Sequence, residues 1–232
     1  MSVLVARDLV KSFRGGDGGV VPVLNGVNLS VSRGEMIAIV GASGAGKSTL
    51  LHVLGALDRP DRGEVVLNGQ SLSNRTDDDL AALRNRAVGF VFQFHHLLRE
   101  FSALENVMMP LRIAGREPVM ARARAAELLA TVGLSHRADH RPSELSGGEQ
   151  QRTAVARALA LDPAVFLADE PSGNLDHANA EMLHDLLAKL ARELEIAMVV
   201  VTHNRSLARR ADRALHLEDG VLQPVDVQGV VS

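Results

Sequence analysis

The sequence predicts an α/β fold with a mostly parallel core sheet, and three observations support this prediction. Short apolar runs typical of buried strands alternate with segments whose apolar residues recur at helical spacing. A glycine-rich loop, Gly41–Ser48, lies between one such run and one such helix. Polar residues that can carry chemistry directly follow several of the runs. Strands that alternate with helices favour a parallel sheet with right-handed crossovers and a ligand at the carboxyl ends of the strands.

Length and composition allow one large domain, or a domain that carries an insertion. The 232 residues contain 25 Lys and Arg against 28 Asp and Glu, so the net charge of −3 gives no bias toward nucleic acid. The absence of cysteine excludes disulfides and cysteine-based zinc sites. The segment Met1–Asp8 lacks the layout of a signal peptide, and no apolar run approaches the ~20 residues that span a bilayer. We therefore expect a soluble chain whose role at a membrane needs a separate partner.

The N-terminal segment predicts strands. Val3–Phe13 alternates loosely between apolar and polar residues, as a half-exposed strand does, and Gly15–Gly19 predicts a flexible loop. Val21–Val31 is expected to form two strands separated at Asn25-Gly26. Later in the chain, Glu64–Leu67 followed by Asn68-Gly69 predicts a strand that enters a hairpin.

A phosphate-binding loop organises the rest of the chain. The run Met36–Val40 predicts a buried strand and Thr49–Leu57 a helix, so the intervening loop (GASGAGKS) turns tightly into a helix N-terminus. Glycines let backbone N–H groups converge on an anion, and the helix end adds roughly half a positive charge. A chance glycine turn would not require the lysine and serine that suit phosphates and Mg²⁺. We expect the chain to bind a nucleoside triphosphate through Gly41, Ser43, Gly44, Ala45, Gly46, Lys47, Ser48 and Thr49.

The middle of the chain predicts helices. Thr76 caps a helix that runs to about Arg86, and Val88–Phe92 is expected to be a strand that ends at Gln93. Ser102 and Glu105 form a capping box for a helix that reaches about Ile113, and Pro118–Val132 predicts another helix. The absence of a predicted strand between residues 94 and 141 indicates an inserted helical subdomain.

Three further elements complete the predicted fold. Ser146-Gly147-Gly148 begins a helix that runs to about Leu161. Val165–Ala168 predicts a buried strand, and Asp176 caps a long helix with leucines on one face. Ala197–Val201 is expected to be the final core strand.

Four polar residues close to predicted strand ends suit phosphate chemistry. Asp169 is placed to coordinate Mg²⁺, and Glu170 beside it to orient or deprotonate a water. The alternative for this pair is an exposed acidic cap of a neighbouring helix. Gln93 could bridge Mg²⁺ and the water, and His203 could donate to a γ-phosphate, although either one alone would more often be an ordinary polar residue. Together with Lys47 they would meet at one edge of the sheet.

Other polar patterns are more ambiguous. The Ser146-Gly147-Gly148 helix start is a second possible anion site, but glycines that allow close packing explain it equally well. His136 and His140 have a spacing that suits zinc, yet no further ligands are evident nearby, so we interpret them as surface or packing residues. The same interpretation applies to the adjacent residues His95 and His96. Two helical arginines, Arg122 and Arg124, are interpreted as part of a solvated helix face.

Leu145–Arg152 (LSGGEQQR) adds a resemblance. Together with the phosphate loop, Gln93, Asp169-Glu170 and His203 in this order, it resembles the ATPase subunits of ABC transporters over nearly the whole chain. The resemblance implies a P-loop NTPase (ABC ATPase) fold with a mostly parallel core sheet, an N-terminal antiparallel β-subdomain and an inserted α-helical subdomain. It implies one ATPase domain, residues 1–232, with its core in 1–93 and 142–232 and its helical subdomain in 94–141.

The resemblance also implies ATP and Mg²⁺ as cofactors, held in a homodimer. In this family two ATPase domains join head to tail, and the signature helix of one closes on the ATP of the other. Ser146, Gly147 and Gly148 would thus face the partner's γ-phosphate, Asp176 would cross the interface, and Phe13 stands where the family has an adenine-stacking aromatic, usually tyrosine. Ser48, Gln93 and Asp169 would hold the metal. Both halves of the composite site are present, so a two-fold dimer would have two competent sites, closed by ATP and released by its hydrolysis.

A narrower similarity lies in Phe92–Leu98, Ser102–Val107, His140–Leu145 and Glu170–Asp176. These segments resemble ATPases of bacterial lipoprotein-releasing complexes, in a group that includes macrolide-exporter and cell-division ATPases. The resemblance implies a peripheral location at the cytoplasmic face of the bacterial inner membrane, under LolC/LolE-type integral membrane permease subunits, with no direct nucleic-acid contact. Related exporter-type or division-type complexes remain alternatives. A soluble ABC ATPase acting on nucleic acid or ribosomes fits less well, because the chain has no coiled-coil insertion, zinc-binding cysteines or second cassette.

Apolar residues after Gln93 have two interpretations. Phe94, Leu97, Leu98 and Phe101 could line a groove that receives a helix of the membrane partner, or could simply pack the helical subdomain.

Overall fold

The computed structural model describes residues 2–16 and 18–226, and its strands form two sheets. The N-terminal sheet has the order β2-β1-β4-β5 and is antiparallel throughout. Its strands are β1 (Ser2–Arg14), β2 (Val20–Ser32), β4 (Arg62–Leu67) and β5 (Gln70–Ser71). The loop predicted at Gly15–Gly19 includes Asp17, which lies outside the described residues.

The core sheet has the order β10-β9-β3-β8-β7-β6 and is parallel except for the edge strand β10. The mostly parallel core sheet predicted from the sequence is therefore confirmed. Its strands are β3 (Met36–Val40), β6 (Val88–Val91), β7 (Val165–Asp169), β8 (Ala197–Val201), β9 (Arg213–Glu218) and β10 (Val221–Val225).

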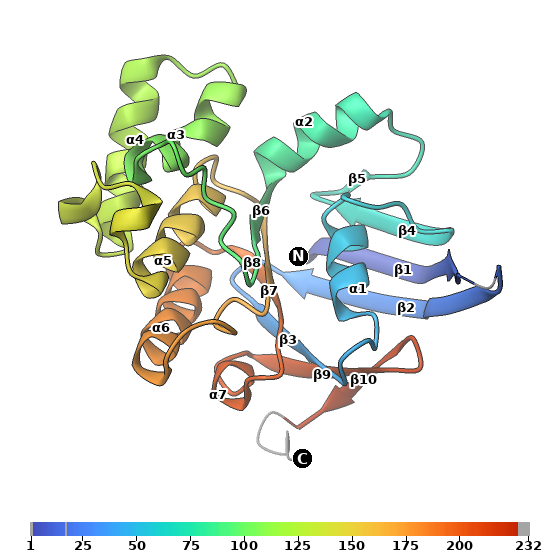
Figure 1. Cartoon of the computed structure of the whole chain (residues 1–232). Helices are drawn as coiled ribbons and strands as arrows, with labels where there is room; N and C mark the ends of the chain where they lie inside the picture. The colour runs from blue at the N-terminus through green and yellow to red at the C-terminus, as the bar shows by residue number, and fades with distance from the viewer. Residues whose placement is uncertain (1, 17, 227–232) are drawn as a thin grey trace.

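The core sheet is buried on both faces, and β3 shows why its sequence is apolar throughout. Met36, Ala38 and Val40 belong to one hydrophobic core, while Ile37 and Ile39 belong to a second. Successive side chains of a strand point to opposite faces, so a strand buried on both sides has no polar position. The helical part packs in the first core, and the N-terminal sheet with α1 packs in the second (Figure 1).

Helices lie in the order expected from the sequence. Thr76, Ser102 and Asp176 each cap a helix, and each side chain accepts the backbone N–H three residues later. The helices are α1 (Lys47–Leu54), α2 (Asp77–Ala87), α3 (Ala103–Ile113), α4 (Pro118–Thr131), α5 (Gly147–Ala158), α6 (His177–Glu193) and α7 (Arg205–Ala208), with 3₁₀ turns at Ser135–Arg137 and Pro142–Glu144.

Two predictions about strands were wrong. β2 is one strand, not two, because Gly26 forms a bulge: β1 pairs Leu9 with Val27 and Val10 with Asn25, which leaves the glycine as an extra residue at φ +78°. β8 is not the final core strand, since β9 pairs with the opposite side of β3 and β10 extends the edge. α5 also ends at Ala158, earlier than the expected Leu161.

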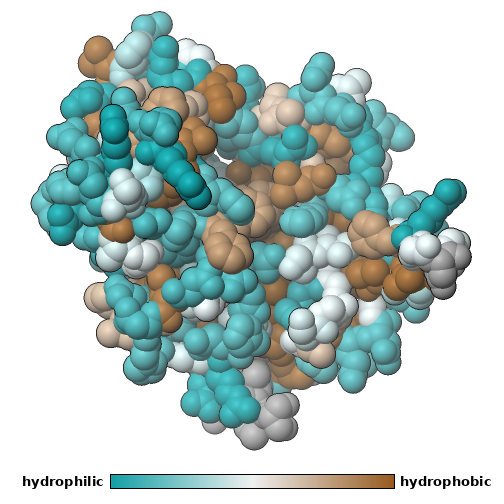
Figure 2. Space-filling view, viewed as in Figure 1, coloured by the Kyte–Doolittle hydropathy of each residue, from teal (hydrophilic) through white to brown (hydrophobic). Residues whose placement is uncertain are grey.

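The surface is hollowed on the face shown in Figure 2. The hollow lies between the helical part and the part that carries α2, and apolar side chains gather at its base. Among residues 2–16 and 18–226, no helix combines the length and apolar character needed to cross a bilayer.

Candidate functional site

The strand order brings the predicted site residues to one edge of the core sheet. β3, β8, β7 and β6 are consecutive neighbours and run parallel, so their carboxyl ends meet. Lys47 follows β3, His203 follows β8, Asp169 ends β7 and Gln93 follows β6. Residues more than 150 positions apart in the chain are thereby neighbours along one sheet edge.

The phosphate loop needs its glycines for conformation and for packing. Gly41, Gly44 and Gly46 have φ of +155°, +80° and +95°, a region that disfavours other residues. A Cβ on Gly41 would lie 2.5 Å from the Leu217 carbonyl oxygen, and one on Gly46 would lie 2.6 Å from Val23 Cγ1. The loop therefore fits against β9 and β2 only with glycine at these positions.

The N-terminus of α1 has the charge and the free backbone groups that favour an anion. α1 has no side-chain cap and no acidic residue in its first turn, so its positive end is not neutralised. Lys47 Nζ donates to the carbonyl oxygens of Gly41 and Ala42, each at 2.8 Å. The ammonium thus lies over its own loop, where a phosphate oxygen could take the place of a carbonyl.

Glu170 and His203 form a direct pair. The His203 backbone N–H donates to Glu170 Oε1 at 3.0 Å, and the ring Nδ1 lies 2.8 Å from the same oxygen. The Thr202 hydroxyl donates to Glu170 Oε2 at 3.2 Å. Glu170 has φ +45°, an uncommon conformation for glutamate, and its N–H donates to the Val201 carbonyl. β7 and β8 thus place a carboxylate and an imidazole together although 33 residues separate them.

Gln93 is held by the loop that leads to Asp176. Gln93 Nε2 donates to Asn174 Oδ1 at 3.1 Å, and Asn174 Nδ2 donates to the Gln93 carbonyl at 3.2 Å. A Cβ on Gly173 would lie 2.9 Å from Gln93 Nε2, so the loop passes close to this amide. Asn174 was missed as a site residue, because only the structure shows that its loop returns to the end of β6.

The Ser146-Gly147-Gly148 segment begins α5 with a capping box. Ser146 Oγ accepts the Glu149 N–H, and the Glu149 carboxylate accepts the Ser146 N–H at 2.8 Å. This N–H bond is the main reason why the pKa of Glu149 lies below its ordinary value, and Arg137 lowers it further. A Cβ on Gly148 would lie 2.4 Å from Asn179 Oδ1. Close packing against α6 therefore requires Gly148, whereas the nearest atom to a Cβ on Gly147 would be 3.8 Å away.

Within one chain, the two candidate anion-binding helix starts, those of α1 and α5, belong to different layers. α5 packs on α3, α4, α6 and β6, whereas α1 packs on β2, β7 and β8. Asp176 caps α6 and accepts from Asn179 N at 2.9 Å and Asn179 Nδ2 at 2.6 Å. The Asn179 backbone bond is the first cause that lowers the pKa of Asp176.

Phe13 is 45 % exposed on β1, so part of its side chain is accessible to a stacking partner. Lys11 Nζ lies 5.3 Å from its ring centroid. A further exposed set follows Gln93: Phe94, Leu98 and Phe101 are exposed, and Phe94 lines a hollow of about 650 Å³ together with Leu97 and Pro142.

The last sequence predictions to compare concern two arginines of α4 and a possible metal site. Arg122 is exposed as expected, but the expectation for Arg124 was wrong: it is partly buried and pairs with Asp162 at 2.6 Å and Glu127 at 3.2 Å. This pair ties α4 to the segment after α5. In the part of the chain that the structure describes, no cluster of three His, Cys, Asp or Glu side chains could hold a metal ion.

Comparison with known proteins supplies a context for this geometry. Residues 24–173 match the family model described as "ABC transporter". The chain is 50% identical over 223 residues to the lipoprotein-releasing system ATP-binding protein LolD of Desulfotalea psychrophila, covering 96% of this chain and 99% of that protein. It is 54% identical over 219 residues to LolD of Geobacter metallireducens, covering 94% and 97%. A dimeric post-hydrolysis structure of the ATP-binding cassette MJ0796, bound to ADP and Pi, superposes with a TM-score of 0.88 at 38% identity, covering 97% of this chain and 99% of that one.

Proposed function

Because the chain belongs to the ABC transporter family of ATP-binding proteins, we propose that it hydrolyses ATP between two copies of itself and thereby drives membrane subunits that release lipoproteins. It is an ABC-type ATPase. The observation that supports the proposal most directly is the Glu170–His203 pair beside the phosphate loop. In the proposed dimer, the helix starts of α1 and α5, which lie in separate layers of one chain, would face the same nucleotide from two copies.

The phosphate loop is proposed to hold the triphosphate. The free N–H groups at the start of α1 would bind phosphate oxygens, and Lys47 would exchange its carbonyl partners for the β- and γ-phosphates. Gly41, Ser43, Gly44, Ala45, Gly46 and Thr49 are assigned to the same cradle. Phe13 would stack on the adenine, for which its exposed ring is suited.

The oxygen donors at the sheet edge fit Mg²⁺. Ser48, Gln93 and Asp169 offer a hydroxyl, an amide oxygen and a carboxylate, which are hard ligands, and one carboxylate with substrate phosphates is the usual magnesium environment. When bound, the ion would neutralise charge on the β- and γ-phosphates.

Hydrolysis is proposed to use Glu170 as the base. Its carboxylate would take a proton from a water as the water oxygen bonds to the γ-phosphorus, while the bond from phosphorus to the bridging oxygen breaks. His203 holds Glu170 through two hydrogen-bonding groups, and its ring, which is 74% exposed, can turn to a γ-phosphate oxygen. Gln93 would orient the water.

A second copy would complete the site. Its Ser146, Gly147 and Gly148 would face the γ-phosphate with the positive end of α5, and Asp176 would lie at the interface. The family's dimeric cassette MJ0796 supports this arrangement. We further propose that residues 1–93 and 142–232 form the core, with the antiparallel β-subdomain, and that residues 94–141 form the helical subdomain.

The membrane partner is proposed from the relatives. Proteins named as ATP-binding components of lipoprotein-releasing systems are 50% and 54% identical to this chain over nearly its whole length. We place the chain peripherally at the cytoplasmic face of a bacterial inner membrane, under permease subunits of the LolC/LolE type. The hollow lined by Phe94 and Leu97 would receive a permease helix, since the exposed apolar side chains of Phe94, Leu98 and Phe101 favour burial against a partner.

Phe94→Asp tests the partner assignment. The substitution places a charge on the rim of the hollow and should abolish co-purification of the permease subunits from detergent-solubilised membranes, while ATP binding by the chain persists. Ile113→Asp is a matched control, because Ile113 is also an exposed apolar residue, at the end of α3. Unchanged co-purification with Phe94→Asp would refute the docking assignment, and recovery of exporter-type or division-type permeases would redirect the function.

A further inference from the structure

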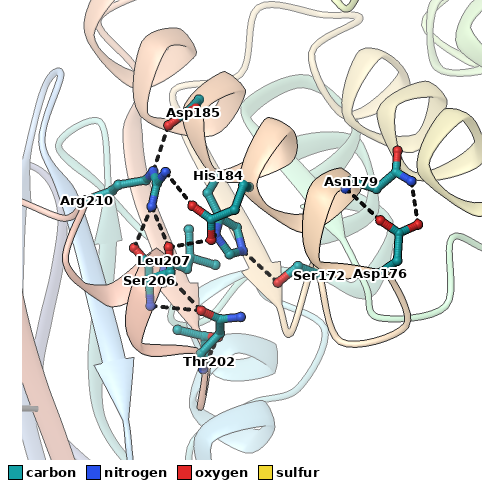
Figure 3. Close-up of polar contacts among 11 residues, drawn as sticks. Ser172, Asp176, Asn179, His184, Asp185, Thr202, Ser206, Leu207 and Arg210 are labelled. Carbon is teal, nitrogen blue, oxygen red and sulfur yellow. Dashed lines mark hydrogen bonds and ion pairs between the residues drawn. The ribbon is translucent and has the colours of Figure 1, made fainter. Parts of the chain in front are cut away.

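A polar network with a buried centre joins α6 to α7, outside the phosphate loop (Figure 3). Its centre is His184 on α6, which is fully buried. His184 Nε2 lies 2.8 Å from the Ser172 hydroxyl, and Ser172 is itself buried in the loop that connects Glu170 to Asp176. One end of the network therefore holds the segment that carries the base and the interface aspartate.

The other end of the network holds α7. His184 Nδ1 lies 3.5 Å from Glu181 Oε1, and Glu181 accepts the Ser206 hydroxyl at 2.6 Å and pairs with Arg210 at 2.8 Å. Arg210 also donates to the Ser206 carbonyl at 3.0 Å and pairs with Asp185 at 2.8 Å. Side chains of α6 thus bond to residues near the start and just after the end of α7, the short helix that begins two residues after His203.

A short bridge joins α7 to the base. Asn204 Oδ1 caps α7, and the Asn204 N–H donates to the Thr202 hydroxyl at 2.9 Å. The same Thr202 hydroxyl donates to Glu170. The network therefore reaches Glu170 from two directions, through Ser172 on its own loop and through Thr202 from the His203 side.

The residue type at position 184 is not what packing alone favours. Its neighbours on the buried face of α6 are apolar, including Ala180, Leu183 and Leu187. Burial lowers the pKa of His184, so the ring is neutral near pH 7. Among the described residues, no group lies within hydrogen-bonding geometry of its Nδ1. A buried polar group that is only partly hydrogen-bonded lowers stability compared with an apolar side chain of similar size. In the tautomer that carries its proton on Nδ1, 3.5 Å from the Glu181 carboxylate, Nε2 would accept the Ser172 hydroxyl.

We propose that His184 is a positioning residue for ATP hydrolysis: it fixes the Ser172 loop and, through Glu181, the α7 segment, so that Glu170, His203 and Asp176 keep one relative arrangement. This inference rests on the proposed roles of those three residues. His184 touches no reacting atom. Its contribution is to the geometry of the pair and therefore to kcat rather than to ATP affinity.

The test compares His184→Leu with His184→Gln in the purified full chain. Leucine fills the space without polar atoms, and the glutamine amide can again accept the Ser172 hydroxyl. We expect His184→Leu to lower kcat between about 10-fold and about 100-fold, with the KM for ATP and the melting temperature close to wild type, and His184→Gln to restore much of the loss. Lys189→Ala, on the exposed face of α6, is the control that should change nothing.

Three results would overturn the inference: wild-type kcat in His184→Leu, no rescue by His184→Gln, or a parallel fall of ATP affinity, melting temperature and kcat. If His184→Leu does not fold, Ser172→Ala removes the other end of the same bond and must reproduce the loss of kcat, and a normal rate there overturns the inference. Glu170→Gln is measured alongside. Full turnover in that variant would refute the proposed role of Glu170 as the base, on which this inference rests, whereas an inactive Glu170→Gln with a normal His184→Leu would refute only the positioning role.

Discussion

Glu170→Gln is the substitution whose effect the structure defines best. The carboxylate accepts the His203 N–H at 3.0 Å, contacts the His203 ring at 2.8 Å and accepts the Thr202 hydroxyl at 3.2 Å. Glutamine keeps the shape but turns one acceptor oxygen into a donor, so one hydrogen bond to a charged group is lost, worth about 1.5–3 kcal/mol. The fold has enough remaining contacts to tolerate this loss, because the backbone bond of Glu170 to Val201 is unaffected.

The catalytic effect of Glu170→Gln should be larger. Removal of a general base costs about 10²–10⁴ in rate, equivalent to about 2.7–5.4 kcal/mol in the barrier. Phosphate release at saturating ATP and Mg²⁺ measures kcat, and equilibrium binding measures ATP affinity, which we expect to stay within about threefold. Size-exclusion chromatography should show ATP-dependent dimer accumulating. Turnover within about threefold of wild type would refute the assignment of Glu170 as the base, and Glu193→Gln, an exposed carboxylate on α6, serves as the control.

Three further outcomes are expected. Lys47→Ala removes the ammonium that lies over the phosphate loop and should lose ATP affinity by tenfold or more, equivalent to about 1.4 kcal/mol, in a binding titration; retained affinity would contradict the loop assignment. Ser146→Arg should abolish turnover and leave nucleotide binding, whereas Ser102→Arg, which breaks the same kind of capping box on α3, should lose only about 1 kcal/mol of stability; equal turnover in both would exclude a role for Ser146 across the interface. The pKa of Glu149 is lowered in the fold, so its carboxylate stabilises the chain above the unfolded pKa and this contribution disappears as the pH falls through the lowered value; thermal unfolding from pH 6 to pH 3 should show a steeper loss for wild type than for Glu149→Gln, and parallel curves would be inconsistent with this.

Local patterns in the sequence predicted the tight glycine turn before α1 and the helix caps, because they involve residues that are close in the chain. The phosphate loop and the capping serines can each be predicted from a motif of eight residues or fewer, since the hydrogen bonds of the caps are formed within one helical turn. The prediction that Gly26 breaks β2 failed for a physical reason: a glycine at positive φ can make a bulge as well as a turn, and only the partner strand decides between them.

Contacts between segments that are distant in the chain could not be predicted from local sequence patterns. β9 pairs with β3, more than 170 residues away in the chain, and β10 is a short edge strand that contains Pro224, which weakens any strand prediction. The Gln93–Asn174 and His184–Ser172 contacts depend on loops whose paths are set by the sheet. The resemblance to a family named candidate site residues, but only the structure shows which of them touch.

The most direct test of the central proposal is the structure of Glu170→Gln bound to ATP and Mg²⁺. The proposal predicts two copies related by a two-fold axis, with each γ-phosphate between Lys47 of one copy and the Ser146–Gly148 helix end of the other. A γ-phosphate that is open to solvent, with no second copy able to approach it, would contradict the proposal.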